Sequence, residues 1–319
     1  MTAESIPSRA PAASPALTIN SRAWLLLVIL GLLWGGSFFF TQIVIRQLPP
    51  LPLVAARLTL AALALLTYLR LRGISLKPLQ GRAVDFLILG LLNNAVPFLL
   101  LAIGQTVVGG GLASILNATT PLWTILVAAA ATRDERLTGQ KLAGVALGIV
   151  GVVVLIGPGA LGAAQSVPLF AFAALIGATF FYALGGVFAR RFRGVPPAVI
   201  ATGQLCASSL IMAPLTLVLY GPSVYAGLSL GGTAALAALA LAATALAFIF
   251  YFEVVASAGA TNASLVTFLV PASAILLGVV FLGERLTIEE IAGFALILAG
   301  LAAIDGRLPR AIRARISRR

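Results

Sequence analysis

The sequence predicts an all-α membrane protein with ten transmembrane helices. They form two inverted-topology repeats of five helices, with both termini in the cytosol. Three observations lead to this prediction: 61% of the 319 residues are hydrophobic and only 9% are charged, long apolar runs recur from Trp24 onward, and the two halves resemble each other. A soluble domain is about 25% charged and needs those charges to cover its surface. The composition therefore disfavours a soluble enzyme, a disordered chain and a fibrous protein.

The chain has one Cys and no His. One Cys cannot form an internal disulfide, no Cys/His metal site can be assembled, and catalysis that needs His is excluded. An intramembrane enzyme would need a nucleophile–base pair or a metal, and no mid-span carboxylate pair replaces them. We therefore expect no enzyme activity, no cofactor and no metal.

The elements follow from the apolar runs. Residues 1–23 are rich in Pro, Ala and Ser and contain no apolar run, which predicts a disordered cytosolic arm rather than a signal peptide. A hydrocarbon core of about 30 Å needs about 20 helical residues, and most of the runs reach that length. The two runs 140–156 and 288–304 are short, and a buried non-spanning helix is the alternative for each. The predicted spans are 24–45, 51–71, 83–104, 109–131, 140–156, 169–189, 196–219, 232–252, 261–282 and 288–304.

Helices are favoured over a barrel because the runs are continuously apolar and do not alternate. With a cytosolic N-terminus and ten spans, 18 of the 21 Lys and Arg residues fall on the cytosolic side. Only Arg46, Arg57 and Arg285 lie at or near the outside, as the positive-inside rule requires. The same rule explains the net charge of +12 better than nucleic-acid binding does. The basic tail 306–319 is a plain stop-transfer anchor or, alternatively, a site for anionic headgroups.

The repeat is visible in two matched segments. Residues 135–151 read ERLTGQKLAGVALGIVG and residues 284–300 read ERLTIEEIAGFALILAG, with nine of seventeen positions identical. Upstream, GGGLASILNATTP from Gly109 matches GATNASLVTFLVP from Gly259. Each half carries five predicted spans, and because five is odd the second copy enters the membrane upside down. Inverted repeats are the usual plan of secondary transporters, with the substrate site near the midplane between the halves.

The repeated AS-x6-P and ERLT signature resembles the EamA domain of the drug/metabolite transporter superfamily. The segment LLWGGSFFF, Leu32 to Phe40, is similar to the first span of that family. The resemblance implies two EamA repeats, 24–156 and 169–305, joined by an external linker at 157–168. Within the family the chain resembles bacterial amino-acid exporters of the YddG type, which carry aromatic and neutral amino acids. That implies a multi-pass protein of the bacterial inner (plasma) membrane.

Prolines at matched positions in the two repeats predict gating kinks. Pro121 and Pro271 fall mid-span, where a proline frees a backbone carbonyl and bends the helix. A static membrane kink is the alternative interpretation. Pro97, which has no repeat partner, is a weaker candidate of the same kind.

Polar and aromatic residues at helical spacing predict a substrate cavity. Such a cavity would suit a zwitterion with an apolar side chain, whose ends need donors and acceptors. For each Ser or Thr, interhelical hydrogen bonding is the alternative. The predicted substrate-binding residues are Trp34, Ser37, Phe38, Thr41, Asn94, Asn117, Thr120, Thr179, Tyr182, Thr244, Phe248, Tyr251 and Thr267.

The few charged residues within the predicted spans restrict the kinds of solute that the protein can transport. Arg57 is expected to extend outward to the headgroups or, alternatively, to meet an anion. Glu253 is the nearest candidate for a proton site, although a headgroup-level carboxylate is the plainer interpretation. Small multidrug members of the superfamily place a Glu in the first helix, and this chain has none there. Because sugar-phosphate members use central Lys or Arg and only Arg57 is available, phosphorylated cargo is disfavoured.

These patterns predict a secondary transporter that exports small metabolites, chiefly amino acids, by alternating access. The partners are a small-molecule substrate and the lipid bilayer, with no nucleic acid, and the protein is a monomer. The pairs Gly31-xxx-Gly35 and Gly144-xxx-Gly148 predict close helix contacts within the chain, and homodimerisation is the alternative. Export of other small organic compounds or drugs and lipid flipping are the alternative functions. A channel is disfavoured because no ring-forming charged motif is present.

Overall fold

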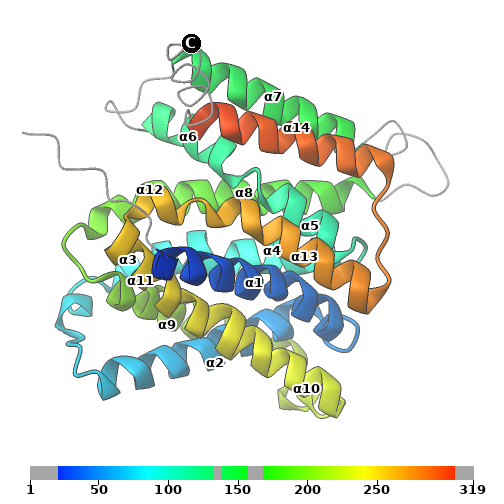
Figure 1. The fold of residues 1–319 in the computed structure, drawn as a ribbon. Coiled ribbons are helices and arrows are strands. Elements are labelled where there is room, and N and C mark those ends of the chain that lie inside the picture. Colours follow the sequence, from blue (N-terminus) through cyan, green and yellow to red (C-terminus); the bar gives the residue numbers. More distant parts are fainter. Residues whose placement is uncertain (1–20, 132–137, 157–167, 306–319) are drawn as a thin grey trace, which may run out of the picture.

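The computed structural model describes residues 21–131, 138–156 and 168–305, and all regular structure in these ranges is helical (Figure 1). Four predicted features lie wholly or partly outside the described residues: the arm up to residue 20, residues 135–137 of the first ERLT segment, residues 157–167 of the linker, and the basic tail. The all-helical prediction is therefore confirmed for the described part of the chain.

The first repeat begins with α1 and α2, continues through a third and a fourth helix that are each subdivided, and ends with α7. Their bounds are α1 Ser21–Val44, α2 Pro50–Leu71, α3 Ala83–Gly90, η2 Leu91–Ala95, α4 Val96–Gln105, α5 Gly110–Asn117, α6 Thr120–Ala131 and α7 Gly139–Ile156. A short 3₁₀ turn, η1 Lys77–Leu79, precedes α3.

The second repeat has the same order. Its elements are α8 Leu169–Ala189, η4 Arg190–Phe192, α9 Pro197–Tyr220, η5 Pro222–Tyr225, α10 Leu230–Ala237, η6 Ala238–Leu246, α11 Ala247–Ala258, α12 Ala260–Ala263, α13 Val266–Leu282 and α14 Ile288–Asp305.

Eight continuous helical segments of the described chain are long and apolar enough to cross a membrane. They correspond to the first eight predicted spans, and α13, with 17 residues, is a shorter apolar helix. The largest shift is in the predicted span 232–252, whose helix runs from Leu230 to Ala258. The exact number of spans and the side of each terminus remain predictions.

Irregular backbone occurs at matched places in the two repeats. The third helix of each contains a π-helical segment, η2 in the first and η6 in the second. The fourth helix of each is broken, between Asn117 and Thr120 in one and between Ala263 and Val266 in the other. Since π segments and broken helices in membrane proteins collect around binding sites, this matched pair points to the space between the repeats.

The two repeats pack against each other through small residues. On α1, a β-carbon at Gly35 would lie 2.8 Å from the carbonyl oxygen of Val270 on α13. The Ser273 hydroxyl of α13 donates to the Gly31 carbonyl at 2.7 Å. The predicted close contact at Gly31 and Gly35 is therefore intramolecular.

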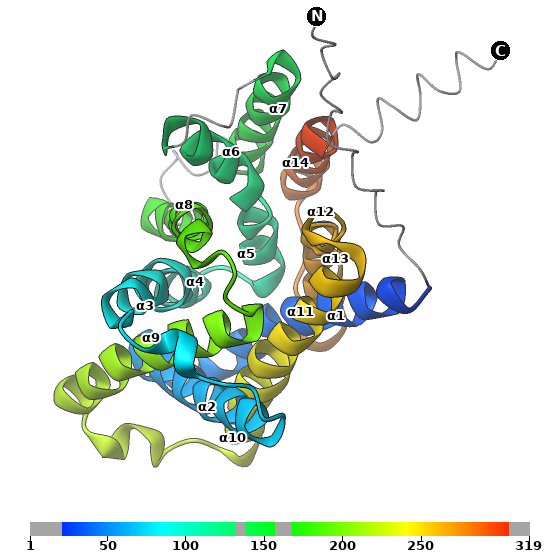
Figure 2. The same cartoon turned by 90° about the vertical axis from the view of Figure 1, so that its left-hand side faces the viewer.

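The last helices of the two repeats, α7 and α14, form a second close pair. A β-carbon at Gly144 would lie 2.7 Å from the carbonyl oxygen of Gly300, and one at Gly151 would lie 2.8 Å from that of Gly293. Figures 1 and 2 show this pair at one edge of the bundle, beside α6 and apart from α2 and α9.

Candidate functional site

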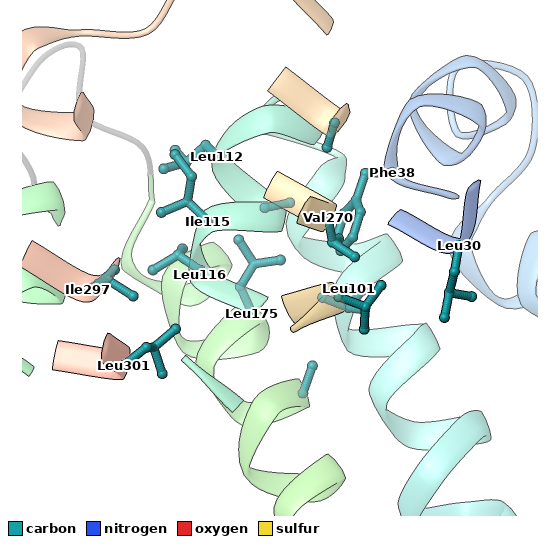
Figure 3. Close-up of a cluster of buried hydrophobic side chains, with 14 of the residues drawn as sticks. Leu30, Phe38, Leu101, Leu112, Ile115, Leu116, Leu175, Val270, Ile297 and Leu301 are labelled. Carbon is teal, nitrogen blue, oxygen red and sulfur yellow. The ribbon is translucent and has the colours of Figure 1, made fainter. Parts of the chain in front are cut away.

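A cavity of about 690 Å³ lies between the repeats. Its walls come from α1, α2, α4, α5, α6 and the π segment η2 of the first repeat, and from α8, η6, α11, α12, α13 and α14 of the second. The hydrophobic cluster beside it also spans both repeats: Phe38, Leu101 and Val270, from α1, α4 and α13, lie close together in Figure 3. All three also line the cavity.

Most of the predicted substrate-binding residues meet in this cavity. The structure brings together Trp34, Ser37, Phe38, Thr41, Asn117, Thr120, Tyr182, Thr244, Phe248, Tyr251 and Thr267. Asn94 and Thr179 are also fully buried but do not line the cavity. Their binding role stays a prediction.

Aromatic side chains from both repeats form part of the cavity wall. The rings of Trp34 and Tyr251 lie 5.5 Å apart, which joins α1 to α11. The rings of Phe98 and Tyr182 lie 6.4 Å apart and meet edge to face, which joins α4 to α8. Each pair connects one repeat to the other, so the aromatic lining belongs to the interface.

Arg57 differs from the outward-reaching side chain favoured by the sequence. It is 7% exposed and lines the cavity, roughly 10 Å along α2 from Pro50. Its Nε donates to the Thr244 hydroxyl at 2.9 Å, and its guanidinium carbon lies 3.8 Å from the centre of the Phe98 ring. Of the charged side chains that the structure describes, only Arg57 lines the cavity.

The Arg57–Thr244 bond has a counterpart on the other side of the bundle. Thr244 belongs to η6, and Arg57 comes from the second helix of the opposite repeat. Asn93, in η2, likewise donates to Gln204 Oε1 at 3.0 Å, and Gln204 lies on the second helix of the opposite repeat. Both π segments are therefore tied to the partner repeat by a polar side chain.

Two asparagines near the cavity have unpartnered polar atoms. Asn117, at the break between α5 and α6, lines the cavity, and its Oδ1 is buried with no hydrogen-bond partner among the described residues. Both amide atoms of Asn94 are likewise buried and unpartnered within the described part of the chain, although Asn94 does not line the cavity. A buried polar group without a partner is costly, so Asn117 is a candidate acceptor for a ligand donor.

Glu284 links the repeats at the start of α5. Its carboxylate accepts hydrogen bonds from the backbone N–H of Gly110 at 2.7 Å and of Gly111 at 2.9 Å. These N–H groups belong to the first turn of the helix, where a carboxylate also meets the positive end of the helix dipole. A β-carbon at Gly109 would lie 2.7 Å from the Glu284 carboxyl carbon, so the glycines leave space for it.

Glu253, the candidate proton site, forms an ion pair with Arg22 and does not line the cavity. Its side chain is 38% exposed. This placement agrees with the plainer of the two interpretations, a carboxylate near the surface.

Two of the predicted gating prolines lie in the first turn of a helix, and the third lies inside one. Pro121 is in the first turn of α6, where a missing N–H leaves no hydrogen bond unmade, and the helix breaks just before it. Pro271 lies inside α13, six residues after the break at 264–265. Both line the cavity, whereas Pro97, in the first turn of α4, does not.

The predicted substrate-binding residues do not include Gln105, Phe98 or Asn93, which the structure places at the cavity. Gln105 is 1% exposed and donates to the Phe38 carbonyl at 2.9 Å. A buried Gln in an apolar helix was the available signal for it. Phe98 carries no such signal, because its role depends on Arg57 above its ring.

Two parts of the chain, residues 21–157 and 169–304, each match the EamA-like transporter family. Over 275 residues, the chain is 29% identical to the uncharacterized inner membrane transporter YedA of Escherichia coli (strain K12), covering 82% of this chain and 83% of YedA. It is 28% identical over 295 residues to a probable amino-acid metabolite efflux pump of the same organism, covering 86% of this chain and 92% of the pump. A solved crystal structure shares the fold with a TM-score of 0.64 at 23% identity, covering 90% of this chain and 98% of that one.

Proposed function

The chain belongs to the EamA-like transporter family, and on that premise we propose that this multi-pass membrane transporter exports neutral amino acids, including aromatic ones, across the bacterial inner membrane. The observation that carries the proposal is the cavity between the repeats, in which aromatic rings and neutral hydrogen-bonding groups surround Arg57. An amino acid presents an apolar side chain beside two polar ends, and such a lining supplies partners for both.

We assign the cavity residues to two binding roles, one for the apolar side chain of the solute and one for its polar ends. The rings of Trp34, Tyr182, Phe248 and Tyr251 contact the apolar side chain of the solute. Hydroxyl and amide groups supply donors and acceptors for its polar ends, and they belong to Ser37, Thr41, Asn117, Thr120, Thr244 and Thr267. These assignments are supported by the shared cavity.

The proposed topology is ten spans with both termini in the cytosol. The distribution of Lys and Arg supports it, and so does the matched order of elements in the two repeats. In this orientation α5 begins and α13 ends at the outer side, so Glu284 joins the repeats there.

Alternating access then consists of one repeat rocking against the other around the cavity. The broken fourth helices and the π segments of the third helices lie at this interface and supply the places where the backbone can adjust. Pro121 and Pro271 line the same interface.

Purified protein in proteoliposomes tests the proposal. We expect accelerated flux of labelled phenylalanine or leucine relative to protein-free liposomes, in a panel that also contains cationic dyes and a fluorescent phospholipid. No flux for any neutral amino acid would refute the substrate assignment. Movement of the dyes alone or of the phospholipid alone would favour a drug exporter or a lipid flippase.

A further inference from the structure

Arg57 is a charged side chain held in a fixed orientation at the cavity wall. The Thr244 hydroxyl donates its own proton to the Leu239 carbonyl at 2.7 Å, so its oxygen is free to accept the 2.9 Å hydrogen bond from Arg57 Nε. Leu239 is five residues before Thr244, a spacing that the π segment η6 provides. The Phe98 ring supports the guanidinium on one side, with the guanidinium carbon 3.8 Å from the ring centre.

None of these contacts neutralises the charge, because Thr244 and Phe98 are both uncharged. Two described carboxylates lie close in sequence to helices that line the cavity, and both interact with other groups. Glu253 forms an ion pair with Arg22, and Glu284 accepts hydrogen bonds from the first turn of α5. Of the carboxylates whose side chains the structure describes, none lines the cavity. An unpaired cation buried inside a membrane protein is costly, so the cavity is electrostatically incomplete without an anion.

The donors that remain on Arg57 fit one kind of anion. Nε is occupied by Thr244, and the two terminal NH₂ groups make no hydrogen bond to any part of the chain that the structure describes. Two parallel N–H groups of a guanidinium match the two oxygens of a carboxylate. A single arginine compensates one negative charge, whereas a phosphate dianion would keep one charge unpaired in a cavity with no second described cation.

We propose that Arg57 binds the carboxylate of the transported solute. This inference rests on the proposed function, because it assigns a ligand group to the transport cavity. It also makes the carboxylate a requirement for recognition, which an aromatic cavity alone would not impose. Asn117, at the α5–α6 break, lines the same cavity, so its side chain is the candidate partner for the ammonium group of an amino acid.

Binding to the purified full-length protein tests the role of Arg57 with three small probes that share one aromatic ring. Phenylalanine carries both charges, 3-phenylpropionate carries only the carboxylate, and phenylalaninamide lacks the carboxylate. Trp34 lines the cavity and the other two tryptophans do not, so tryptophan fluorescence in a Trp24→Phe, Trp123→Phe background reports occupancy, and calorimetry gives the dissociation constants for the protein with all three tryptophans. We expect both carboxylates to bind about tenfold or more tightly than the amide, since a buried charge pair loses that much or more when one partner is removed.

Arg57→Gln should abolish this preference by weakening carboxylate binding about tenfold or more while amide binding changes little. The matched control is Arg46→Gln, which removes the same charge from an exposed position after α1 and leaves the preference intact. Thr244→Val keeps the cation and removes its orienting acceptor, so carboxylate binding weakens by roughly threefold to tenfold. If Arg57→Gln does not fold, the same comparison of carboxylate and amide binding is made with Thr244→Val and Arg57→Lys.

Equal binding of acid and amide by the unaltered protein would overturn the inference, as would an acid preference that survives in Arg57→Gln. The proposed function fails separately. Proteoliposomes that move no amino acid, although 3-phenylpropionate binds through Arg57, would refute the substrate and leave the carboxylate site standing. Amino-acid flux with an unchanged acid preference in Arg57→Gln would refute the site and leave the function standing.

Discussion

Replacing Glu284 by Gln should open the end of the bundle at which α5 begins. The Glu284 carboxylate now accepts two backbone hydrogen bonds, from Gly110 at 2.7 Å and from Gly111 at 2.9 Å. A glutamine side chain has one oxygen for two N–H donors, and its NH₂ group cannot accept from the second. The change therefore loses one charge-assisted hydrogen bond and makes the other neutral, a loss of about 2 kcal/mol for the closed arrangement.

That loss corresponds to a population of the open arrangement that is roughly thirtyfold larger. Val108 is 3% exposed in the loop just before α5, so a cysteine there reports opening. In a Cys206→Ser background, we expect Val108→Cys to react with a membrane-impermeant maleimide about ten to thirty times faster when Glu284 is replaced by glutamine.

Glu289→Gln is the matched control, because it makes the same chemical change at an exposed position of α14. It should leave the labelling rate unchanged. A labelling rate that is the same with and without the Glu284→Gln substitution would refute the claim that the hydrogen bonds of Glu284 hold the two repeats together at this end.

Three further predictions concern the cavity and the packing. Asn117→Ala should slow flux more than Trp24→Ala does, because Asn117 lines the cavity and Trp24 is 48% exposed; equal rates per folded protein would contradict the site. Gly35→Ala should lower the melting temperature of the detergent-solubilised protein, because its β-carbon would lie 2.8 Å from two backbone atoms of α13. Gly186→Ala should lower it little, because no described atom lies within 4 Å of its β-carbon position, and equal shifts would contradict the account of the α1–α13 contact. Thr216→Val should leave stability unchanged or raise it by up to about 1 kcal/mol, because the buried Thr216 hydroxyl has no partner among the residues that the structure describes; a clear loss in thermal unfolding would show that the hydroxyl is in fact engaged.

The helix ranges were predictable because a lipid environment leaves few options. Backbone groups must be paired within the helix, so a run of about 20 apolar residues gives both the type and the approximate bounds of an element. The segments from α1 to α9 follow this rule closely. The break before Pro121 was not predictable in detail, since a proline tolerates either a kink within a helix or a place in the first turn of a new one.

The neighbouring residues Asn93 and Asn94 show a second limit. Helical spacing assumes about 3.6 residues per turn, and a π segment inserts extra backbone that rotates the following side chains. Both residues lie in η2, where Asn93 lines the cavity and Asn94 does not. The sequence carried no sign of this segment, so it did not show which of the two asparagines faces the cavity.

Arg57 shows a third limit, because its placement depends on a distant part of the chain. Thr244 lies 187 residues away, and Phe98 comes from a different helix of the same repeat. The outward course favoured from sequence is the usual one for an arginine in a span. Only the packing of α2 against η6 and α4 provides a reason for the side chain to stay inside.

Counterflow in proteoliposomes tests the central claim most directly, since it detects exchange through the protein without requiring a coupling ion. Vesicles loaded with unlabelled phenylalanine should transiently accumulate external labelled phenylalanine, with and without a proton gradient, and Asn117→Ala vesicles should accumulate less. Accumulation no greater than in protein-free vesicles, across the neutral amino acids, would contradict the account.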